Sequence, residues 1–582
     1  MKTVERSRLT PELAARFPRP GMATPGKIDY SPDSKFVTYL FSERGDLARD
    51  LWRLDLSSGK AERWLTPPGE GVTEANISRQ EALRRERLRL RETGITDYIW
   101  AEKANVLLLP LRGELFRWSE SGMTRIAADG VIDPKISADG SRVFFIRDGD
   151  VWTIDHGRER RLTAHPPATT NGLAEFVAQE ELGRMSGYWP SPSGDLVAFE
   201  QLDASNIPIY PIVHQGKAEL QIEEHRYPFA GAANARVKLG VVDARSGAIT
   251  FMDLGIEDGY IARVQWHPDG RLFVQWLSRD WRQLEILAYD VSTGGGRGIL
   301  VERQEPWINL HDDLRILEST GEFVWSSERS GYRHLYLYAP DGRLIRQLTS
   351  GDWPAEATVG LDEKRRQLYF VGWQETPLER QLFRVSLDAG PIEQLTTDAG
   401  MHGAEVAPDF TSFIDVWSSR QTPPTVTVRS LSGGAERPVH SPAEIDLELR
   451  PPEFHRFRNR DGIELHAALY FPPPSTGEGT VGAAGGTVGA RPPVIVSVYG
   501  GPGPQMVNES WGQTVDLSAQ LLAQHGFVVL KVDNRGSARR GLAFEAPIAR
   551  NLGEIEVNDQ VDGVRWLGTL GVADSSRVGV IG

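Results

Sequence analysis

The sequence predicts an eight-bladed β-propeller followed by an α/β domain. Three observations predict this order: a turn motif recurs through most of the chain, two short strands follow most of these turns, and the pattern changes after about residue 445. Repeated units of turn, strand, turn and strand are typical of four-stranded propeller blades. We count eight such units between residues 24 and 440. A generic all-β domain with many hairpins is the alternative interpretation.

The recurring turn has the form Ser or His, Pro, Asp and Gly, and it precedes an apolar strand. Most units end in a polar stretch with Leu-Thr, as at residues 65–66 and 348–349. The spacing between turns is irregular, so the longer units should contain insertions. The turns begin at Ser31, Ser137, Ser191, His267 and Ala407, with weaker equivalents near Ala101, Glu318 and Leu361.

Two insertions have the pattern of helices rather than of strands. The first lies near residues 77–92 and is predicted as a charged helix with Leu83, Leu88 and Leu90 as its apolar positions. The second spans residues 171–185 and also has apolar positions at helical spacing. Helices that interrupt a series of blades require a reason in packing or in function.

Residues 445–582 contain continuous apolar strands that alternate with helices, as expected for a sheet whose strands are buried on both faces. The segment 472–493 repeats Gly-Thr-Val-Gly-Ala and is predicted as a flexible loop between two strands. The last strand is predicted to be buried, and domains rarely end at such a strand. The predicted strands are 493–499, 526–533 and 577–582, and the predicted helices are 516–525 and 557–570.

The composition excludes several classes of protein. The 582 residues contain no cysteine, which excludes disulfides, thiolate nucleophiles and cysteine-ligated metals. The 65 basic and 79 acidic side chains give a net charge of −14, which argues against nucleic acid as a partner. No apolar run is long enough for a membrane span and no signal-like start is visible, so we expect no membrane partner and a cytoplasmic location. The alternative is a periplasmic location, if the true start carries a signal.

Five motifs occur in a fixed order along the chain. They are Gln-Glu-Glu-Leu at 179–182 with Gly-Tyr-Trp at 187–189, Glu-Arg-Ser-Gly-Tyr-Arg-His-Leu-Tyr at 328–336, Val-Tyr-Gly-Gly-Pro-Gly at 498–503, Val-Asp-Asn-Arg-Gly-Ser at 532–537 and Glu-Val-Asn-Asp-Gln at 556–560. With these motifs, nearly the whole chain resembles the dipeptidyl peptidase IV branch of the prolyl oligopeptidase family of serine peptidases. The resemblance implies a β-propeller at 24–440, followed at 445–582 by an incomplete α/β-hydrolase domain.

Glu180 and Glu181 are the first candidate substrate-binding residues. Two adjacent carboxylates repel each other, so a cation between them relieves the repulsion and gains charge-assisted hydrogen bonds. By resemblance, the pair binds the N-terminal ammonium of a peptide. This places the peptide bond after the second residue at the site of cleavage. A solvated glutamate pair on a helix surface is the alternative.

Tyr499 precedes a Gly-Gly-Pro turn, and by resemblance its hydroxyl is an oxyanion-hole donor. The alternative is a core tyrosine at a strand end. Mammalian relatives clamp the substrate carbonyl with an arginine, and Arg84 or Arg85 could serve here because a guanidinium offers planar donors. The sequence departs from the mammalian pattern at this point, so the alternative is that Arg84 and Arg85 belong to a basic helix face exposed to solvent. Arg535 lies near the expected catalytic face, where a structural ion pair explains it equally well.

The nucleophile, acid and histidine of a serine hydrolase are not identified in this sequence. No serine has glycines both two residues before and two residues after it, as a Gly-x-Ser-x-Gly elbow requires. In the family this elbow follows a strand like 577–582, so we expect the catalytic Ser, Asp and His to lie beyond Gly582. The chain as given is expected to be truncated and inactive alone. We also expect an uncovered apolar face and poor solubility of the α/β part.

The complete form is expected to be a serine aminodipeptidase that releases N-terminal X-Pro or X-Ala dipeptides through an acyl-enzyme. Its partners are peptides with a free N-terminus and, as is common in the family, a second copy in a homodimer. The alternative is a non-catalytic propeller protein that binds peptide N-termini. The glutamate pair disfavours acylaminoacyl or oligopeptidase specificity. No cofactor or metal is expected, because the 12 histidines are scattered and no phosphate-binding loop is found.

Overall fold

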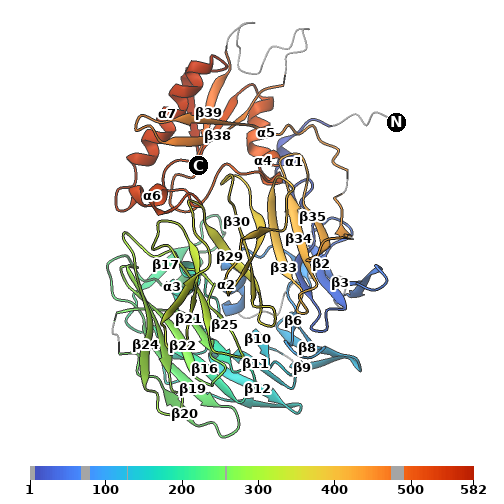
Figure 1. Cartoon of the computed structure of the whole chain (residues 1–582), viewed down its shortest axis with the longest axis vertical. Helices are drawn as coiled ribbons and strands as arrows, with labels where there is room; N and C mark the ends of the chain where they lie inside the picture. The colour runs from blue at the N-terminus through green and yellow to red at the C-terminus, as the bar shows by residue number, and fades with distance from the viewer. Residues whose placement is uncertain are drawn as a thin grey trace.

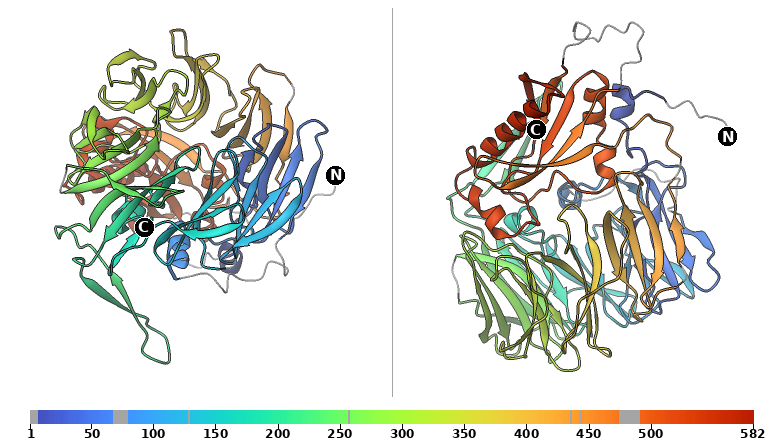
Figure 2. Two further views of the ribbon diagram at one scale, coloured as in Figure 1. Left: turned by 90° about the horizontal axis from the view of Figure 1, so that it is seen from below. Right: turned by 45° about the horizontal axis from the view of Figure 1, so that its top comes forward.

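The computed structural model describes residues 7–66, 79–127, 129–255, 258–434, 436–442, 444–473 and 491–582. Eight antiparallel sheets form a ring, and a five-stranded sheet lies on one side of this ring (Figures 1 and 2). The eight-bladed propeller predicted from the turn repeats is therefore confirmed. The first two residues of the predicted insertion at 77–92 and most of the predicted loop at 472–493 lie outside the described residues.

Blades 1 to 4 follow one another along the chain, each as an antiparallel meander. Their strands are β1 (Gly26–Tyr30), β2 (Phe36–Phe41), β3 (Ala48–Asp55) and β4 (Ala61–Leu65); β6 (Ile99–Trp100), β7 (Leu107–Leu111), β8 (Glu114–Ser119) and β9 (Gly122–Ala127); β10 (Ile132–Ile136), β11 (Arg142–Arg147), β12 (Asp150–Asp155) and β13 (Arg158–Arg161); and β14 (Thr169–Asn171), β15 (Tyr188–Pro190), β16 (Leu196–Asp203), β19 (Arg236–Asp243) and β20 (Ile249–Phe251). The short strand β5 (Thr93–Gly94) pairs in parallel with β3 of blade 1.

Blades 5 to 8 repeat the four-stranded meander without helical insertions. Their strands are β21 (Gly259–Trp266), β22 (Leu272–Ser278), β23 (Gln283–Tyr289) and β24 (Gly296–Arg303); β25 (Arg315–Ile316), β26 (Phe323–Ser327), β27 (His334–Tyr338) and β28 (Leu344–Gln347); β29 (Ala355–Asp362), β30 (Gln367–Gly372), β31 (Gln381–Ser386) and β32 (Glu393–Gln394); and β33 (Met401–Val406), β34 (Ser412–Ser418), β35 (Thr425–Ser430) and β36 (Arg437–His440).

The propeller core consists of apolar layers between neighbouring blades. Successive side chains of a strand point to opposite faces, so Phe144 packs toward blade 4 whereas Phe145 packs toward blade 2. The ring closes in the same way, because Val37 of blade 1 and Ile414 of blade 8 share one buried cluster. Every blade therefore buries both of its faces.

Two short helices belong to the described part of the propeller, α2 (Arg79–Arg87) and α3 (Phe176–Glu180), whereas α1 (Pro11–Ala14) packs against α5 (Leu517–Gln524) of the α/β domain. The helix predicted at 171–185 is much shorter than expected. Asn171 belongs to β14, and Gly172 and Gly183 adopt positive φ of 88° and 63°, which a continuous helix does not permit. Within the described residues, no helix has the length and apolar character needed to cross a membrane.

The five-stranded sheet has the order β37-β38-β40-β39-β41, and its last three strands run in parallel. Helix α7 packs on one face against Leu469, and α5 packs on the other face against Ala468. The elements of this domain are β37 (Glu453–Arg458), β38 (Glu464–Tyr470), β39 (Pro493–Ser497), α4 (Trp511–Thr514), α5 (Leu517–Gln524), β40 (Val528–Val532), α6 (Leu542–Glu545), a 3-10 turn (Ala546–Ile548), α7 (Ile555–Leu570) and β41 (Asp574–Ile581).

The last strand differs from the prediction of a buried strand. Within the described residues β41 pairs only with β39, so it forms an edge of the sheet. Val578, Val580 and Ile581 are 42%, 68% and 40% exposed. Apolar side chains on an unpaired edge are unusual in a soluble domain. The expected uncovered apolar surface therefore lies on β41.

Polar contacts fix the α/β domain on blades 7 and 8 of the propeller. The indole of Trp373 donates to the carbonyl of Arg539 at 2.8 Å, and Arg539 Nε donates to Glu356 Oε1 at 2.7 Å. Arg420 forms a second link through Nε to Glu509 Oε2 at 2.8 Å. These contacts hold the carboxyl edge of the parallel strands toward the propeller, where Figure 1 also places the chain end.

Candidate functional site

Helix α3 interrupts the first strand of blade 4. The strand β14 pairs with the end of β16 and stops at Asn171, and β15 resumes pairing with the same strand at Tyr188. The chain between these two half-strands leaves the sheet and forms α3. First strands of neighbouring blades contact each other, as β6 and β10 do, because they lie nearest the propeller axis. The insertion therefore projects from the inner edge of the blade.

A buried polar network holds this insertion in place. The carboxylate of Glu175 caps α3 by accepting hydrogen bonds from Val177 N at 2.7 Å and Ala178 N at 2.6 Å. Arg184 follows the helix and donates from Nη2 to Glu200 Oε2 at 2.7 Å, in a pair that is almost completely buried. Burial and the nearby charge of Glu200 raise the pKa of Glu175 to about 7. The network fixes both ends of the helix.

Glu180 and Glu181 stand at the C-terminal end of α3, and their environments differ. Arg87 donates from Nε to Glu180 Oε1 at 2.7 Å and from Nη1 to Gln179 Oε1 at 2.6 Å. Its guanidinium also lies 5.1 Å from the ring centroid of Phe176. The side chain of Glu181 is exposed and has no hydrogen bond or ion pair with any described residue. One carboxylate of the pair is neutralised, and the other is available to a ligand.

Arg84 and Arg85, the two arginines predicted as a carbonyl clamp, pair with acidic side chains, and their role toward a substrate stays a prediction. Arg85 Nε donates to Glu81 Oε1 at 2.9 Å, and Arg84 lies 3.5 Å from both Glu81 and Asp133. In the described residues neither of them contacts the glutamate pair. The arginine that does so is Arg87, on the last turn of α2. The sequence offered no signal for this choice, because the three arginines share one short helix and differ only in the tertiary partner they meet.

Tyr499 follows β39 at the carboxyl edge of the parallel strands. Its side chain is 60% exposed and has no hydrogen bond to a described residue. The neighbouring Val498 N donates to Ile581 O at 3.0 Å, so the end of β41 lies beside the tyrosine. No hydrogen bond or ion pair of the described residues links Tyr499 to the glutamate pair. Ligands of open α/β sheets bind at this edge.

Asp533 and Arg535 stabilise the loops at the same edge. Asp533 Oδ1 accepts hydrogen bonds from Met506 N at 2.5 Å and Val507 N at 3.1 Å, and burial raises its pKa to about 7. Arg535 forms a two-pronged ion pair with Asp559, at 2.8 and 3.0 Å, and a further pair with Asp461. The guanidinium of Arg535 is thus fully engaged in structural ion pairs.

Two models of known protein families match the chain. The model described as the dipeptidyl peptidase IV (DPP IV) N-terminal region matches residues 114–424, which is more than half of the sequence. The chain belongs to the dipeptidyl peptidase IV family. The model of the prolyl oligopeptidase family also matches, over residues 513–582. The resemblance found from the motifs is confirmed.

Curated relatives of the dipeptidyl peptidase IV family match over most of the chain. Dipeptidyl peptidase 8 of Homo sapiens is 28% identical over 620 residues, covering 87% of this chain and 67% of the relative. The probable dipeptidyl peptidase 4 of Emericella nidulans is 25% identical over 489 residues, covering 77% of this chain and 60% of the relative. This chain therefore spans roughly two thirds of the length of these relatives. A peptidase of the dipeptidyl peptidase IV type is the function that they indicate.

Two solved structures of this family share the fold. The dipeptidyl peptidase 4 of Porphyromonas gingivalis superposes with a TM-score of 0.78 at 23% identity, covering 96% of this chain and 79% of the other. A putative dipeptidyl aminopeptidase IV from Bacteroides ovatus superposes with a TM-score of 0.77 at 22% identity, covering 98% and 81%. Because the superpositions cover 96% and 98% of this chain, they include both its propeller and its α/β domain.

Proposed function

We propose that this chain carries the peptide-binding part of a serine dipeptidyl peptidase that removes X-Pro or X-Ala dipeptides from the N-termini of peptides. The observation that supports this proposal most directly is the glutamate pair on α3, of which Glu181 has no partner among the described residues. A peptide ammonium is a small cation with three donors, and it suits an exposed carboxylate beside a second one. Such an anchor excludes peptides whose N-terminus is blocked.

In this proposal Arg87 has two tasks. Its bond to Glu180 keeps one carboxylate oriented, and its remaining guanidinium donors are available to a carbonyl oxygen of the bound dipeptide. A substrate held at its ammonium and at one carbonyl has a fixed length between the anchor and the cut. Release of dipeptides rather than of single residues follows from that length.

Tyr499 serves the chemical step of the proposed reaction. A serine oxygen attacks the carbonyl carbon of the second residue, and the carbonyl oxygen becomes negatively charged as the new C–O bond forms. The exposed hydroxyl of Tyr499 donates to this oxygen. Collapse of the intermediate breaks the C–N bond, and the leaving amine takes up a proton; water then hydrolyses the ester. The 582 residues contain no Gly-x-Ser-x-Gly elbow, so the proposal places the nucleophile outside them.

A binding experiment with this chain tests the recognition part directly. We expect a dipeptide with a free amine, such as Ile-Pro, to bind, and its N-acetylated form to bind at least about tenfold more weakly, because acetylation removes the charge. Equal affinity for both forms would contradict the ammonium anchor. The coding sequence after Gly582 tests the catalytic part: an in-frame serine elbow supports the peptidase, and its absence supports a non-catalytic protein that binds peptide N-termini.

We further propose that the protein forms a homodimer through the hairpin of β17 (Ile209–Val213) and β18 (Ile222–Arg226). Figure 2 (left) shows this hairpin extending from blade 4. All five residues of β17 are exposed, and Leu220 and Ile222 are 76% and 54% exposed. Apolar ribbons of two strands are marginal in water unless another surface covers them. Sedimentation of a variant without residues 209–226 is expected to show a monomer.

A further inference from the structure

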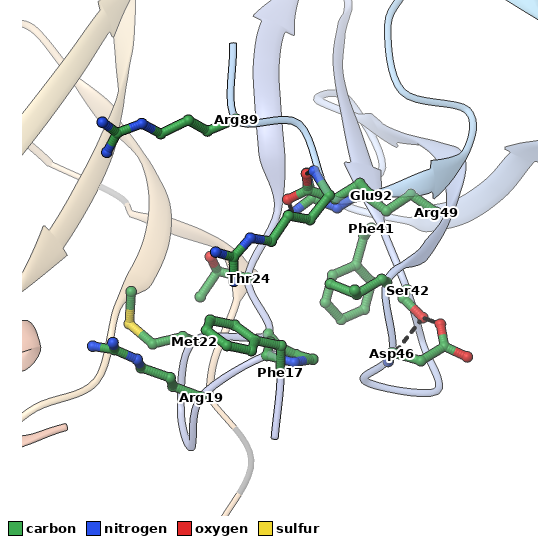
Figure 3. Close-up of a pocket in the computed structure, with 14 residues that line it drawn as sticks. Phe17, Arg19, Met22, Thr24, Phe41, Ser42, Asp46, Arg49, Arg89 and Glu92 are labelled. Carbon is green, nitrogen blue, oxygen red and sulfur yellow. Dashed lines mark hydrogen bonds and ion pairs between the residues drawn. The ribbon is translucent and has the colours of Figure 1, made fainter. Parts of the chain in front are cut away.

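A pocket of about 350 Å³ lies where the segment 17–24 meets blade 1 and the chain that follows α2 (Figure 3). Its walls combine apolar and basic side chains, with Phe17, Met22 and Phe41 as the large apolar ones. The charged side chains that line it are Arg19, Arg49, Arg89, Arg91, Asp46 and Glu92. Four positive and two negative charges are therefore gathered here, in a chain whose net charge is −14.

Both carboxylates of the pocket already have partners. Glu92 Oε1 accepts a hydrogen bond from Arg49 Nη2 at 2.8 Å. Asp46 accepts hydrogen bonds from Ser42 Oγ at 2.6 Å and from Arg44 Nε at 2.9 Å. Neither carboxylate is left to compensate the other arginines of the pocket.

Arg89 and Arg91 form no ion pair with a described carboxylate; Arg19 also forms none, but it lies near enough to Asp516 to interact with its charge. The guanidinium carbons of Arg91 and Arg19 lie 4.5 and 5.9 Å from the ring centroid of Phe17, which orients these groups without neutralising them. In the view of Figure 3, the side chains of Arg19 and Arg89 extend to the same side of the pocket. With no carboxylate of the described residues at ion-pair distance, these like charges repel one another, and a bound anion relieves the repulsion.

We propose that this pocket binds a phosphate-type dianion, as inorganic phosphate or as the phosphate of an organic monoester. Guanidinium groups donate pairs of parallel hydrogen bonds to phosphate oxygens. A dianion with several acceptor oxygens matches three guanidinium groups, whereas a single carboxylate is satisfied by one. Phe17, Phe41 and Met22 supply an apolar wall for the organic part of a monoester.

The position of the pocket links it to the glutamate pair. Arg87 is bonded to Glu180 at one end of the segment 87–92, and Glu92 is bonded to Arg49 at the other end. A dianion held by Arg89 and Arg91 restrains the chain between these two points. An effect of the dianion on peptide binding rests on the proposed function, whereas binding of the dianion itself does not.

Calorimetry with inorganic phosphate at constant ionic strength tests the proposal on the chain as it stands. The double variant Arg89→Gln/Arg91→Gln is expected to bind phosphate at least about tenfold more weakly than the unmodified protein. Arg158→Gln/Arg160→Gln removes the same charge from the exposed strand β13 and is expected to leave the affinity unchanged. Arg19→Gln should also weaken phosphate binding. Because Arg19 lies on a different segment, a loss in both variants cannot come from a folding defect near residues 89–91 alone.

Phenyl phosphate distinguishes the two sources of the dianion. Tighter binding of phenyl phosphate than of inorganic phosphate identifies a monoester that uses the apolar wall, and equal binding identifies free phosphate. The proposal is overturned if phosphate binds equally to the Arg89→Gln/Arg91→Gln variant, if chloride at equal ionic strength gives the same response, or if a glutamate-rich peptide binds and phosphate does not. The measurement involves no peptide hydrolysis. The phosphate-binding proposal therefore stands even if the peptidase proposal fails.

Discussion

Arg87 Nε donates a hydrogen bond to Glu180 Oε1 at 2.7 Å, across 93 positions of the chain. The bond joins the insertion after blade 1 to the insertion inside blade 4. It neutralises the carboxylate of Glu180, whereas that of Glu181 has no hydrogen bond or ion pair with a described residue. The surface that we assign to peptide binding is therefore assembled from two segments that interrupt the propeller, and neither segment alone contains it.

The charge of Glu181 is expected to dominate binding of a free N-terminus. Glu181→Gln should weaken the affinity for Ile-Pro about 10- to 100-fold, because a hydrogen bond to a charged group contributes roughly 1.5–3 kcal/mol. Titration calorimetry measures this change. Glu86→Gln, at an exposed position of α2, serves as the control and should bind like the unmodified protein. An unaltered affinity of Glu181→Gln would exclude the anchor role.

The three arginines of α2 can be separated by substitution. Arg87→Met keeps much of the side-chain volume but removes the donors, and we expect it to lower the affinity for Ile-Pro about tenfold. Arg85→Met should have less than about a threefold effect, because Arg85 is bonded to Glu81 and not to the glutamate pair. If the loss followed Arg84 or Arg85 instead, the assignment from the sequence would be correct and the one from the structure wrong.

The buried ion pair of Arg184 and Glu200 is expected to be a major determinant of stability. Arg184→Met leaves a carboxylate buried without its partner, which typically costs about 3–5 kcal/mol. Urea unfolding followed by tryptophan fluorescence measures this loss. Arg245→Met breaks the exposed pair with Asp195 and should cost less than about 1 kcal/mol. Similar midpoints for the two variants would contradict the importance of burial.

Glu175 is expected to make stability depend on pH. Burial raises its pKa from 4.5 to about 7 in the folded state. Between these values the folded protein binds more protons than the unfolded chain, so the free energy of unfolding falls as the pH rises. The contribution, on the order of 3 kcal/mol, is fully present below pH 4.5 and is lost as the pH passes 7.

The matched variants for this titration are Glu175→Gln and Glu120→Gln. The difference in unfolding free energy between the unmodified protein and Glu175→Gln should change with pH in the stated window. Glu120 is exposed, and its substitution should leave the pH profile unchanged. A profile of Glu175→Gln parallel to that of the unmodified protein would show that the carboxyl does not titrate there.

The edge strand β41 predicts limited solubility. Val580 is 68% exposed on a strand that pairs on one side only, which provides a template for association with other chains. Val580→Lys is expected to raise the soluble fraction and to reduce aggregation in light scattering. Leu552→Lys changes an apolar residue that is 65% exposed but lies outside every strand, and it should have little effect. Equal improvement by both substitutions would point to net charge rather than to the edge.

Local sequence patterns predicted much of this structure. The turn at Ser137 and the strand after it lie where the pattern placed them, because a turn with Asp and Gly and an apolar strand are local features. The change to an α/β sheet after residue 445 was visible for the same reason. The family motifs also contain Glu180, Glu181 and Tyr499, the predicted site residues.

Contacts between distant segments could not be predicted in this way. The predicted helix at 171–185 is only a short helix in the structure, because the strands on either side of it, β14 and β15, both pair with β16. The choice of Arg87 over Arg84 and Arg85 depends on which acids of other segments each guanidinium meets.

The sequence alone thus determined the order of the two folds and the residues able to bind an ammonium group, since periodicity and residue chemistry are properties of neighbouring positions. The tertiary structure alone decided which arginine joins Glu180 and where the guanidinium groups of Arg19, Arg89 and Arg91, which form no ion pair with a described residue, gather. Those outcomes depend on the packing of segments far apart in the chain, and a charge has its effect through the partner that packing brings within hydrogen-bonding distance.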